Sequence, residues 1–213
     1  MQAFTTLTGP AAPLLQANID TDVIIRIERL TSGARDQLGR YAFEALRYHP
    51  DGTENPDFVF NQAKYRGAPI LIAGANFGCG SSREGAVQAL RAMGVTCVIA
   101  DSFGDIFYGN CFQNGVLPIR LPAAEIAALA AESQVSAAPV TVDLAQCLVI
   151  TPLGRQILFT LDTLRRTALL EGLDDIGLTL KQHAEIAAWQ ATDRAARPWV
   201  WHLDTADDRS DPQ

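Results

Sequence analysis

The sequence lacks long apolar runs and any concentration of positive charge. No run in its 213 residues approaches the roughly eighteen apolar residues of a membrane-spanning helix, and the amino-terminal stretch MQAFTTLTGP lacks the layout of a signal peptide. We therefore expect a cytoplasmic protein that does not bind a membrane. The net charge of −7 argues against a nucleic-acid surface, because phosphate binding needs clustered Lys and Arg.

Cysteine is scarce and scattered. The four cysteines form no CxxC pair and have no histidine at metal-ligand spacing, so we expect no metal or cluster in this chain. Cys97 and Cys147 lie in apolar runs that are typical of buried thiols, and a reducing compartment disfavours a disulfide. Only Cys79 and Cys111 remain as thiols of chemical interest.

The pattern that is present favours an α/β fold. The 48% hydrophobic content indicates one main folded domain, expected over 1–161. From Pro69 onward, short apolar runs alternate with helical patterns, and right-handed crossovers would make the strands at 70–73 and 95–100 parallel. Further strands are expected at 116–121, 140–150 and 156–161, and helices at 84–93, 103–112 and 123–132.

The regions before and after the alternating pattern have other compositions. Residues 31–65 are polar and broken by turn residues, so we expect a long loop region over the core, with some helix at 38–46. A helical extension is predicted over 162–205, with Asp162 as a candidate N-cap, and a disordered tail over 206–213.

One face of this extension would carry Ile176, Leu180 and His183, at helical spacing. This pattern makes His183 a packed or rim residue rather than a catalyst.

The most informative stretch is NFGCGSSREG, 76–85, at a predicted strand-to-helix turn. Free N–H groups and the helix dipole favour an anion there. Ser81 and Ser82 add hydroxyls, and Arg83 adds a guanidinium suited to a carboxylate or phosphate. Simple capping is the alternative, with either serine as N-cap and Glu84 in the first turn. The chain has no GK[ST], GxGxxG or GxSxG in this turn, which argues against a phosphate loop, a dinucleotide site and a serine hydrolase.

Two more clusters are unusually polar. In NIDTD, 18–22, two carboxylates two residues apart on an extended segment would face the same side; an Asx turn at a strand start is the alternative. SFGDIFYGNCFQNG, 102–115, has many aromatic and polar side chains for a surface helix. Its alternative interpretation is a packed, capped short helix with Cys111 in the core.

Taken together, these stretches resemble the small subunit of 3-isopropylmalate dehydratase, which is similar to the swivelling domain of aconitase. The matching motifs are NIDTDVII, DGTENPDFVFNQ, NFGCGSSRE and SFGDIFYGNCFQNGVLPI, in that order within 18–120. The resemblance implies a single swivelling β/β/α domain, like aconitase domain 4, with a helical carboxy-terminal extension. It also implies a hydro-lyase of leucine biosynthesis that isomerises 2-isopropylmalate and 3-isopropylmalate.

The resemblance further implies a partner. In that family a large subunit holds a [4Fe-4S] cluster and the small subunit provides the base, so this chain alone would be inactive. Ser81 matches the serine whose alkoxide removes the C–H proton. Because a serine hydroxyl is a very weak acid, that role requires a dry site with N–H dipoles and a cation.

Substrate-binding residues follow from the same resemblance. Ser82 and Arg83 would bind the carboxylates of a small dicarboxylate substrate, and Asp22 would organise this side of the site. Arg29, or alternatively Arg26, would match the arginine that contacts the rest of the substrate.

Two departures from the family pattern stand out. Arg26 replaces a proline found in many relatives, which leaves open a related dehydratase for methylmalate, citraconate or a homoaconitate-type acid. Gly85 replaces a histidine, which predicts a local packing change. A non-catalytic module that binds a carboxylate metabolite is the alternative from another functional class.

Overall fold

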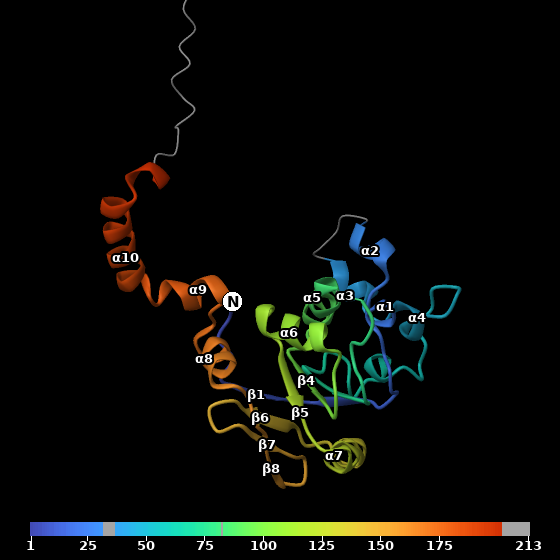
Figure 1. The fold of residues 1–213 in the computed structure, drawn as a ribbon. Helices are drawn as coiled ribbons and strands as arrows, with labels where there is room; N and C mark the ends of the chain where they lie inside the picture. The colour runs from blue at the N-terminus through green and yellow to red at the C-terminus, as the bar shows by residue number, and fades with distance from the viewer. Residues whose placement is uncertain (32–36, 82, 202–213) are drawn as a thin grey trace, which may run out of the picture. The chain divides into compact units, whose positions relative to one another are not determined.

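Two four-stranded sheets form the framework of the chain (Figure 1). A computed structural model describes residues 1–31, 37–81 and 83–201. In the first sheet the strand order is β2-β3-β4-β5, and each neighbouring pair is parallel. Its strands are β2 (Ala11–Leu14), β3 (Ile70–Ala73), β4 (Cys97–Ala100) and β5 (Leu117–Arg120).

Both faces of the parallel sheet are buried. Every residue of β3 and β4 is buried, which explains why ILIA and CVIA are continuously apolar rather than alternating. The predicted parallel strands at 70–73 and 95–100 are therefore confirmed. Helices cover one face (Figure 1): α1 (Thr21–Ile24), α3 (Leu38–Tyr41), α5 (Glu84–Ala92) and α6 (Asp105–Gln113).

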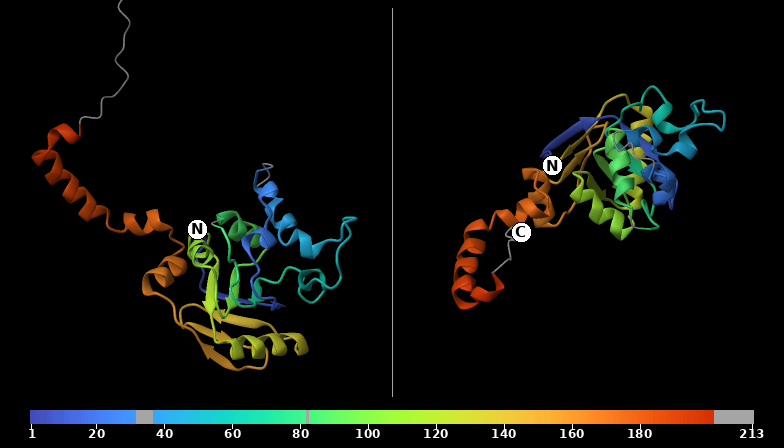
Figure 2. Two further views of the ribbon diagram at one scale, coloured as in Figure 1. Left: turned by 45° about the vertical axis from the view of Figure 1, so that its right-hand side comes forward. Right: turned by 90° about the horizontal axis from the view of Figure 1, so that it is seen from above.

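An antiparallel sheet and one helix cover the other face, as Figure 2 shows. The strand order is β1-β6-β7-β8. The core on this side joins Ile72 and Ile99 of the parallel sheet to Leu129 and Val142. The elements are β1 (Thr6–Gly9), β6 (Val140–Asp143), β7 (Leu148–Ile150), β8 (Gln156–Leu158) and α7 (Ala123–Val135).

The first two strands were not predicted, because a glycine and a proline interrupt their short apolar pattern. The chain leaves the antiparallel sheet at Gly9 and enters the parallel sheet at Ala11. A Cβ on Gly9 would lie 2.5 Å from Cγ of Pro69, so the passage between sheets requires glycine. Two residues that look like strand breakers therefore mark a change of sheet.

The prediction of one strand over 140–150 is wrong, because a tight turn divides it into β6 and β7. The Asp143 carboxylate accepts hydrogen bonds from the backbone N and from Nε2 of Gln146, at 2.9 and 3.0 Å. Cys147 takes a left-handed φ of 50° in this turn and is only partly buried, not the buried thiol that its sequence context predicted.

Residues 37–65 do more than lie over the core. The predicted helix at 38–46 is present as α3 and α4 (Glu44–Arg47), and a 3-10 helix, η2, covers Val59–Asn61. Phe43, Phe58 and Phe60 form a buried aromatic cluster with ring centroids 5.7 to 6.3 Å apart. The segment is therefore part of the core and not only a loop above it.

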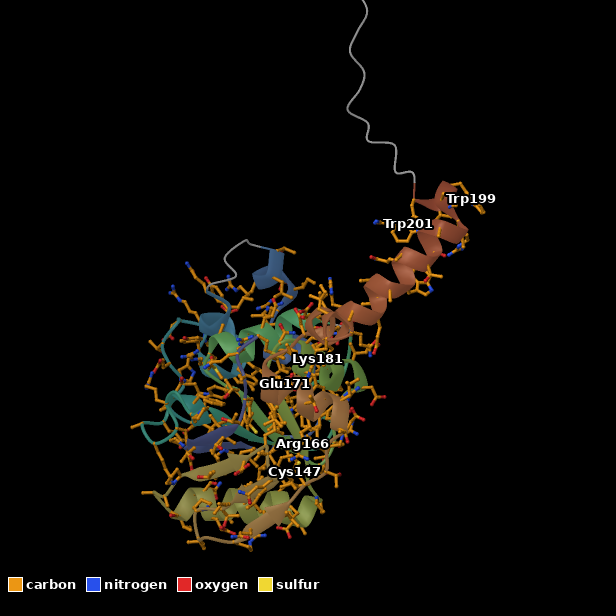
Figure 3. All side chains as sticks on the ribbon, turned by 90° about the vertical axis from the view of Figure 1, so that its left-hand side faces the viewer. Cys147, Arg166, Glu171, Lys181, Trp199 and Trp201 are labelled. Atoms are coloured by element: carbon orange, nitrogen blue, oxygen red, sulfur yellow. The ribbon has the colours of Figure 1, made fainter. Side chains whose placement is uncertain are left out.

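Helix α8 (Thr163–Glu171) packs with the sheets. Asp162 caps it, as predicted, by accepting a hydrogen bond from Arg165 N at 3.1 Å. Leu169 is buried in the core of the antiparallel sheet, and Arg166 donates to the carbonyl of Ala145 in the β6–β7 turn (Figure 3). Met1–Asp174 accordingly forms one compact unit, whereas the domain boundary at 161 stays a prediction.

A second unit begins at Asp175 and contains α9 (Asp175–Leu180), α10 (His183–Ala196) and the 3-10 helix η3 (Pro198–Val200). The predicted continuous face is wrong, because the helix is interrupted between Leu180 and His183, which is exposed.

In this unit, buried Asp193 accepts hydrogen bonds from Trp201 Nε1 and Arg197 Nε at 2.8 and 2.7 Å. Figure 3 labels this tryptophan. The two bonds hold the pKa of Asp193 below its usual range despite its burial. The predicted tail, 206–213, and the end of the predicted extension lie outside the described residues. Within the residues that the structure describes, no helix is long and apolar enough to cross a membrane.

Arg155 joins the β7–β8 hairpin to α7. Its guanidinium forms ion pairs with Glu125 and Glu132, and its Nε and Nη2 donate to Oε1 of Glu132 at 3.1 and 3.0 Å. Burial alone would raise the pKa of Glu132, but hydrogen bonds involving Thr151 and Arg155 outweigh burial and lower it. The carboxylate of Glu132 is therefore stabilised in its charged form.

The start of α5 depends on a small residue at position 85. A Cβ on Gly85 would lie 2.4 Å from Cδ2 of Leu30, in α2 (Ile27–Thr31). The Leu30 side chain thus occupies the space that a side chain at position 85 would need. A leucine side chain that fills this space is the kind of local packing change that the sequence predicted at Gly85.

We expect Arg155→Gln to lower the free energy of unfolding by roughly 1 kcal/mol at pH 7. Because the folded-state pKa of Glu132 is depressed, this difference should be complete above the unfolded glutamate pKa of about 4.3 and shrink as the pH falls through the folded-state value. Urea titrations at neutral and acidic pH measure it. Arg66→Gln, which breaks an exposed pair with Glu54, is the control and should cost less than about 0.5 kcal/mol. A difference that is undiminished in acid would contradict the pairing.

We expect Gly85→Ala to destabilise the protein by about 1 kcal/mol relative to Gly109→Ala, because the end of the flexible Leu30 side chain has to move aside. Gly109 lies in α6 with open space around its Cβ position, so the same substitution there should be neutral or stabilising. Thermal unfolding measures both. In a Leu30→Ala background the cost of Gly85→Ala should largely disappear, whereas an equal cost in both backgrounds would show that Leu30 is not the obstacle.

Candidate active site

Three loops meet at the carboxyl ends of the parallel strands. They follow β2, β3 and β4 and contain residues 15–20, 74–83 and 101–104. In open α/β sheets, ligands bind outside the carboxyl ends of the strands. Each of the three polar clusters that the sequence singled out begins in one of these loops and continues into the helix that follows, so the fold brings the starts of the three clusters together at one edge.

Backbone hydrogen bonds join the first loop to the second. Gly78 N donates to the carbonyl of Ile19 at 2.7 Å, and Thr21 N donates to the carbonyl of Cys79 at 3.0 Å. The hydroxyl of Thr21, which is buried, donates to the carbonyl of Ser81 at 3.1 Å. The backbone of Ser81 is thereby fixed from the first loop.

The second loop is joined to the third in the same way. Phe77 N donates to the carbonyl of Ser102 at 3.1 Å, and Gly104 N donates to the carbonyl of Phe77 at 2.9 Å. The Ser102 hydroxyl accepts from Asn76 N and donates to Asp101 Oδ1, each at 2.8 Å. The central loop is therefore held on both sides.

Two glycines allow this close approach. Gly78 has a φ of 70°, and a Cβ there would lie 2.2 Å from Cγ of Phe107. A Cβ on Gly104 would lie 2.5 Å from the carbonyl oxygen of Gly78. Glycine is thus needed in the turn for packing as well as for bending.

The predicted extended segment at 18–22 is wrong beyond Asp20, because α1 begins at Thr21. The Asp20 carboxylate caps α1 by accepting from Val23 N at 2.8 Å, which is close to the Asx-turn alternative. Asp22 lies in the first turn of the helix with 57% of its side chain exposed. The two carboxylates consequently have different surroundings: one caps a helix and the other faces outward.

Helix α5 begins at Glu84, where the helix predicted over 84–93 begins. Arg83 occupies the N-cap position without a side-chain cap, so the interpretation of Ser81 as the cap is wrong. Ser81 is an exposed residue of the preceding bend, and Ser82 lies outside the described residues. The Ser81 hydroxyl is thus not committed to capping.

Arg83 forms an ion pair with Asp22, and only 17% of its side chain is exposed. The structure therefore joins two of the predicted substrate-binding residues directly, across the gap between α1 and α5. Glu84 is occupied elsewhere, because its Oε1 accepts from Asn114 Nδ2 at 3.1 Å.

Arg29 and Arg26 line a 650 Å³ cavity that also includes Arg40, Tyr41 and Glu44. Arg29 lines a second cavity, of 230 Å³, with Glu84 and Gly85 at the start of α5. Arg29 donates to both carboxylate oxygens of Glu44, at 2.9 and 2.5 Å, and stacks over the ring of Tyr41 at 4.4 Å. The hydrogen bond to Glu44 raises the pKa of Arg29. Arg26 is exposed and pairs with Glu28 at 3.6 Å.

The cysteines provide no reactive pair in the part of the chain that the structure describes. Cys111 and Cys97 are buried, and burial raises the pKa of each thiol, so neither is a reactive thiolate. Cys79 is partly exposed in the central loop. In the described ranges, no group of three His, Cys, Asp or Glu side chains could hold a metal ion.

One positioning residue was missed by sequence reasoning. Thr21 holds the backbone of Ser81, and its only signal was its place between two aspartates in NIDTD. The assembled edge thus offers a serine hydroxyl, a guanidinium and the start of a helix on a rigid backbone. Such a set can bind a carboxylate and move a proton, but it is open to solvent on its outer side.

Comparisons with known proteins identify the family of the chain. The family model of the aconitase C-terminal domain matches residues 1–124, and that of the C-terminal domain of the 3-isopropylmalate dehydratase small subunit matches 175–200. A solved structure of 3-isopropylmalate dehydratase (leuD) from Methanocaldococcus jannaschii superposes with a TM-score of 0.61 at 24% identity. It covers 87% of this chain and 99% of its own, and it supports the fold.

Curated relatives are closer in sequence. The 3-isopropylmalate dehydratase small subunit of Gluconacetobacter diazotrophicus is 54% identical over 93% of this chain and 97% of its own length. The protein of the same name from Paramagnetospirillum magneticum is 51% identical over 94% of this chain and its full length. With these identities over nearly the whole sequence, the chain belongs to the family of 3-isopropylmalate dehydratase small subunits, in the aconitase superfamily.

Proposed function

We propose that this chain is the small subunit of a hydro-lyase of leucine biosynthesis that interconverts 2-isopropylmalate and 3-isopropylmalate by dehydration and rehydration. One observation carries the proposal: Ser81, fixed through its backbone by Thr21, stands two residues from the Arg83–Asp22 pair at the carboxyl edge of the parallel sheet. The names of the relatives support the substrate and the small-subunit role.

Ser81 is the proposed base. Its alkoxide takes the proton from the carbon beside a substrate carboxylate, and the C–H electron pair becomes the double bond as the hydroxyl leaves the neighbouring carbon. The hydroxyl then adds to the carbon that lost the proton, and Ser81 returns its proton to the carbon that lost the hydroxyl, which gives the isomer. The start of α5 and the Arg83 cation favour the alkoxide, provided that water is excluded.

Arg83, with Ser82 as a second donor, is the proposed ligand of a substrate carboxylate. In the free chain Asp22 already pairs with Arg83. Asp22 is mostly exposed and can turn away, so a substrate carboxylate would replace it at the guanidinium. Asp22 would then hold Arg83 in position until the substrate arrives.

A cluster-bearing large subunit is the proposed partner, and the catalytic site would be complete only at the interface. Ser81 is exposed in this chain, so a partner must cover it to make the dry site that an alkoxide needs. A [4Fe-4S] cluster on the partner would supply a Lewis acid for the departing hydroxyl. The donor set of the described residues does not fit such a cluster, which is consistent with this division.

The larger cavity lined by Arg29 is the proposed contact for the variable branch of the substrate. Glu44 neutralises Arg29 through two hydrogen bonds. A third substrate carboxylate would have to compete with Glu44, so the pair favours an uncharged branch over a homoaconitate-type acid. Methylmalate or citraconate, which also lack a third carboxylate, remain as alternative substrates.

Reconstitution tests the proposal. The chain is mixed with a cluster-loaded large subunit, and the absorbance of the unsaturated intermediate is followed with isopropylmalate, methylmalate and a homoaconitate-type acid. The fastest turnover should occur with isopropylmalate. Binding of a dicarboxylate without turnover of any of them would instead favour the non-catalytic module.

Replacing the proposed base should stop the reaction without preventing assembly. We expect Ser81→Ala to reduce kcat by about 10²–10⁴-fold, because proton transfer from carbon loses its acceptor. Co-purification with the large subunit should be unchanged. Ser136→Ala, at the end of α7, is the matched control and should retain full activity. Near-normal turnover of Ser81→Ala would remove Ser81 from the role of base.

A lysine should not replace the arginine at the proposed carboxylate site. We expect Arg83→Lys to weaken substrate binding roughly tenfold, since an ammonium group cannot make a bidentate contact. Steady-state KM and binding of an unreactive malate analogue measure the effect. Arg91→Lys, on the same helix but bonded to the carbonyl of Asn114, is the control. An unchanged affinity in Arg83→Lys would refute the carboxylate assignment.

A further inference from the structure

Two arginines converge on one tyrosine at the border of the carboxyl edge. The guanidinium carbon of Arg120 lies 4.0 Å from the centroid of the Tyr108 ring, and that of Arg165 lies 5.3 Å from it. Arg165 also stacks over Phe112 at 4.7 Å, and Phe112 meets Tyr108 edge-on at 5.1 Å. The three polar residues come from β5, α6 and α8, so tertiary folding assembles this arginine–tyrosine patch.

The two guanidinium groups have no acidic partner in the part of the chain that the structure describes. The ion pairs found there join other arginines, such as Arg83 and Arg155, to carboxylates, but neither Arg120 nor Arg165. Both side chains are exposed. Arg165 also lies in the first turn of α8, where the helix dipole opposes a cation. Two positive charges without a carboxylate partner thus meet at one ring, although the chain as a whole has a net charge of −7.

The patch continues the surface of the candidate site. Arg120 is the last residue of β5 and pairs in register with Ala100, the last residue of β4. The ring of Tyr108 also contacts Phe103, at 5.6 Å, in the third loop of the site. A partner that covers Ser81 along this edge would therefore reach the patch.

We propose that Arg120 and Arg165, held by Tyr108, dock acidic side chains of the cluster-bearing large subunit. This inference rests on the proposed function. The aromatic rings cover guanidinium faces and leave N–H edges free, which is the geometry for bidentate contact with carboxylates. Both chains must meet along an edge next to the active site, and complementary charge would steer this encounter despite the negative net charge of the small subunit.

The test compares two doubly substituted chains in titrations against the large subunit. Arg120→Gln with Arg165→Gln removes the patch, and Lys64→Gln with Arg66→Gln removes the same charge elsewhere. The control pair is matched in charge, and Lys64 also lies over an aromatic ring, that of Tyr65, at 5.3 Å, whereas Arg66 pairs with Glu54. Kd is measured at several salt concentrations, and turnover is measured with saturating large subunit.

We expect the patch variant to bind about tenfold more weakly at low salt, with a smaller salt dependence, and to keep its kcat at saturation. The control should bind like the unsubstituted chain. Equal affinity and salt dependence in both variants would overturn the docking role, and so would equal weakening, which would reflect net charge alone.

Two further measurements complete the test: the single variants, and the unsubstituted chain with the large subunit. If thermal unfolding shows that the double variant is destabilised, Arg120→Gln and Arg165→Gln are measured singly, and each should weaken binding by about threefold. Single variants with unchanged affinity would overturn the proposal. Failure of the unsubstituted chain to bind or activate the large subunit would overturn the proposed function, whereas normal assembly with an unaffected patch variant would overturn only the docking surface.

Discussion

The backbone hydrogen bonds between the three loops at the carboxyl edge are the constraint on which the candidate site depends. They continue the parallel sheet beyond its regular strands, through isolated bridges between Asp20 and Cys79 and between Phe77 and Phe103. Backbone bonds of this kind do not depend on side-chain rotamers, so they give the central loop a rigid base as far as Cys79. The Thr21 hydroxyl adds a hydrogen bond to the carbonyl of Ser81. The buried sheet supports this edge with apolar residues on both faces.

The arginines around this edge have two kinds of surroundings, with and without a carboxylate partner. Arg83 and Arg29 each have a carboxylate partner from another element, Asp22 or Glu44, so these potential anion sites are neutral in the free chain. An anionic ligand must exchange with these partners, which makes binding selective for a carboxylate of suitable geometry. Arg120 and Arg165 lack such partners among the described residues and lie over the ring of Tyr108 instead.

Elements with a continuous pattern were predictable. The parallel strands after Pro69 and the helices at 84–92, 105–113 and 123–135 follow from buried apolar runs and helical periodicity. The predictions failed where one side chain decides a turn: Asp143 divides the predicted strand at 140–150, and Asp20 starts a helix in place of an extended segment. Gly9 and Pro10 hid the first two strands, because a change of sheet resembles a loop in the sequence.

By itself, the sequence determined most strands and helices after Pro69, the three polar clusters and the family resemblance, because these reside in local patterns and motifs. Only the tertiary structure decided which charges meet. The pairing of Arg83 with Asp22, of Arg29 with Glu44, and of Arg120 and Arg165 with Tyr108 joins residues from different elements. Such contacts depend on strand order and helix packing, whose geometry no local pattern records.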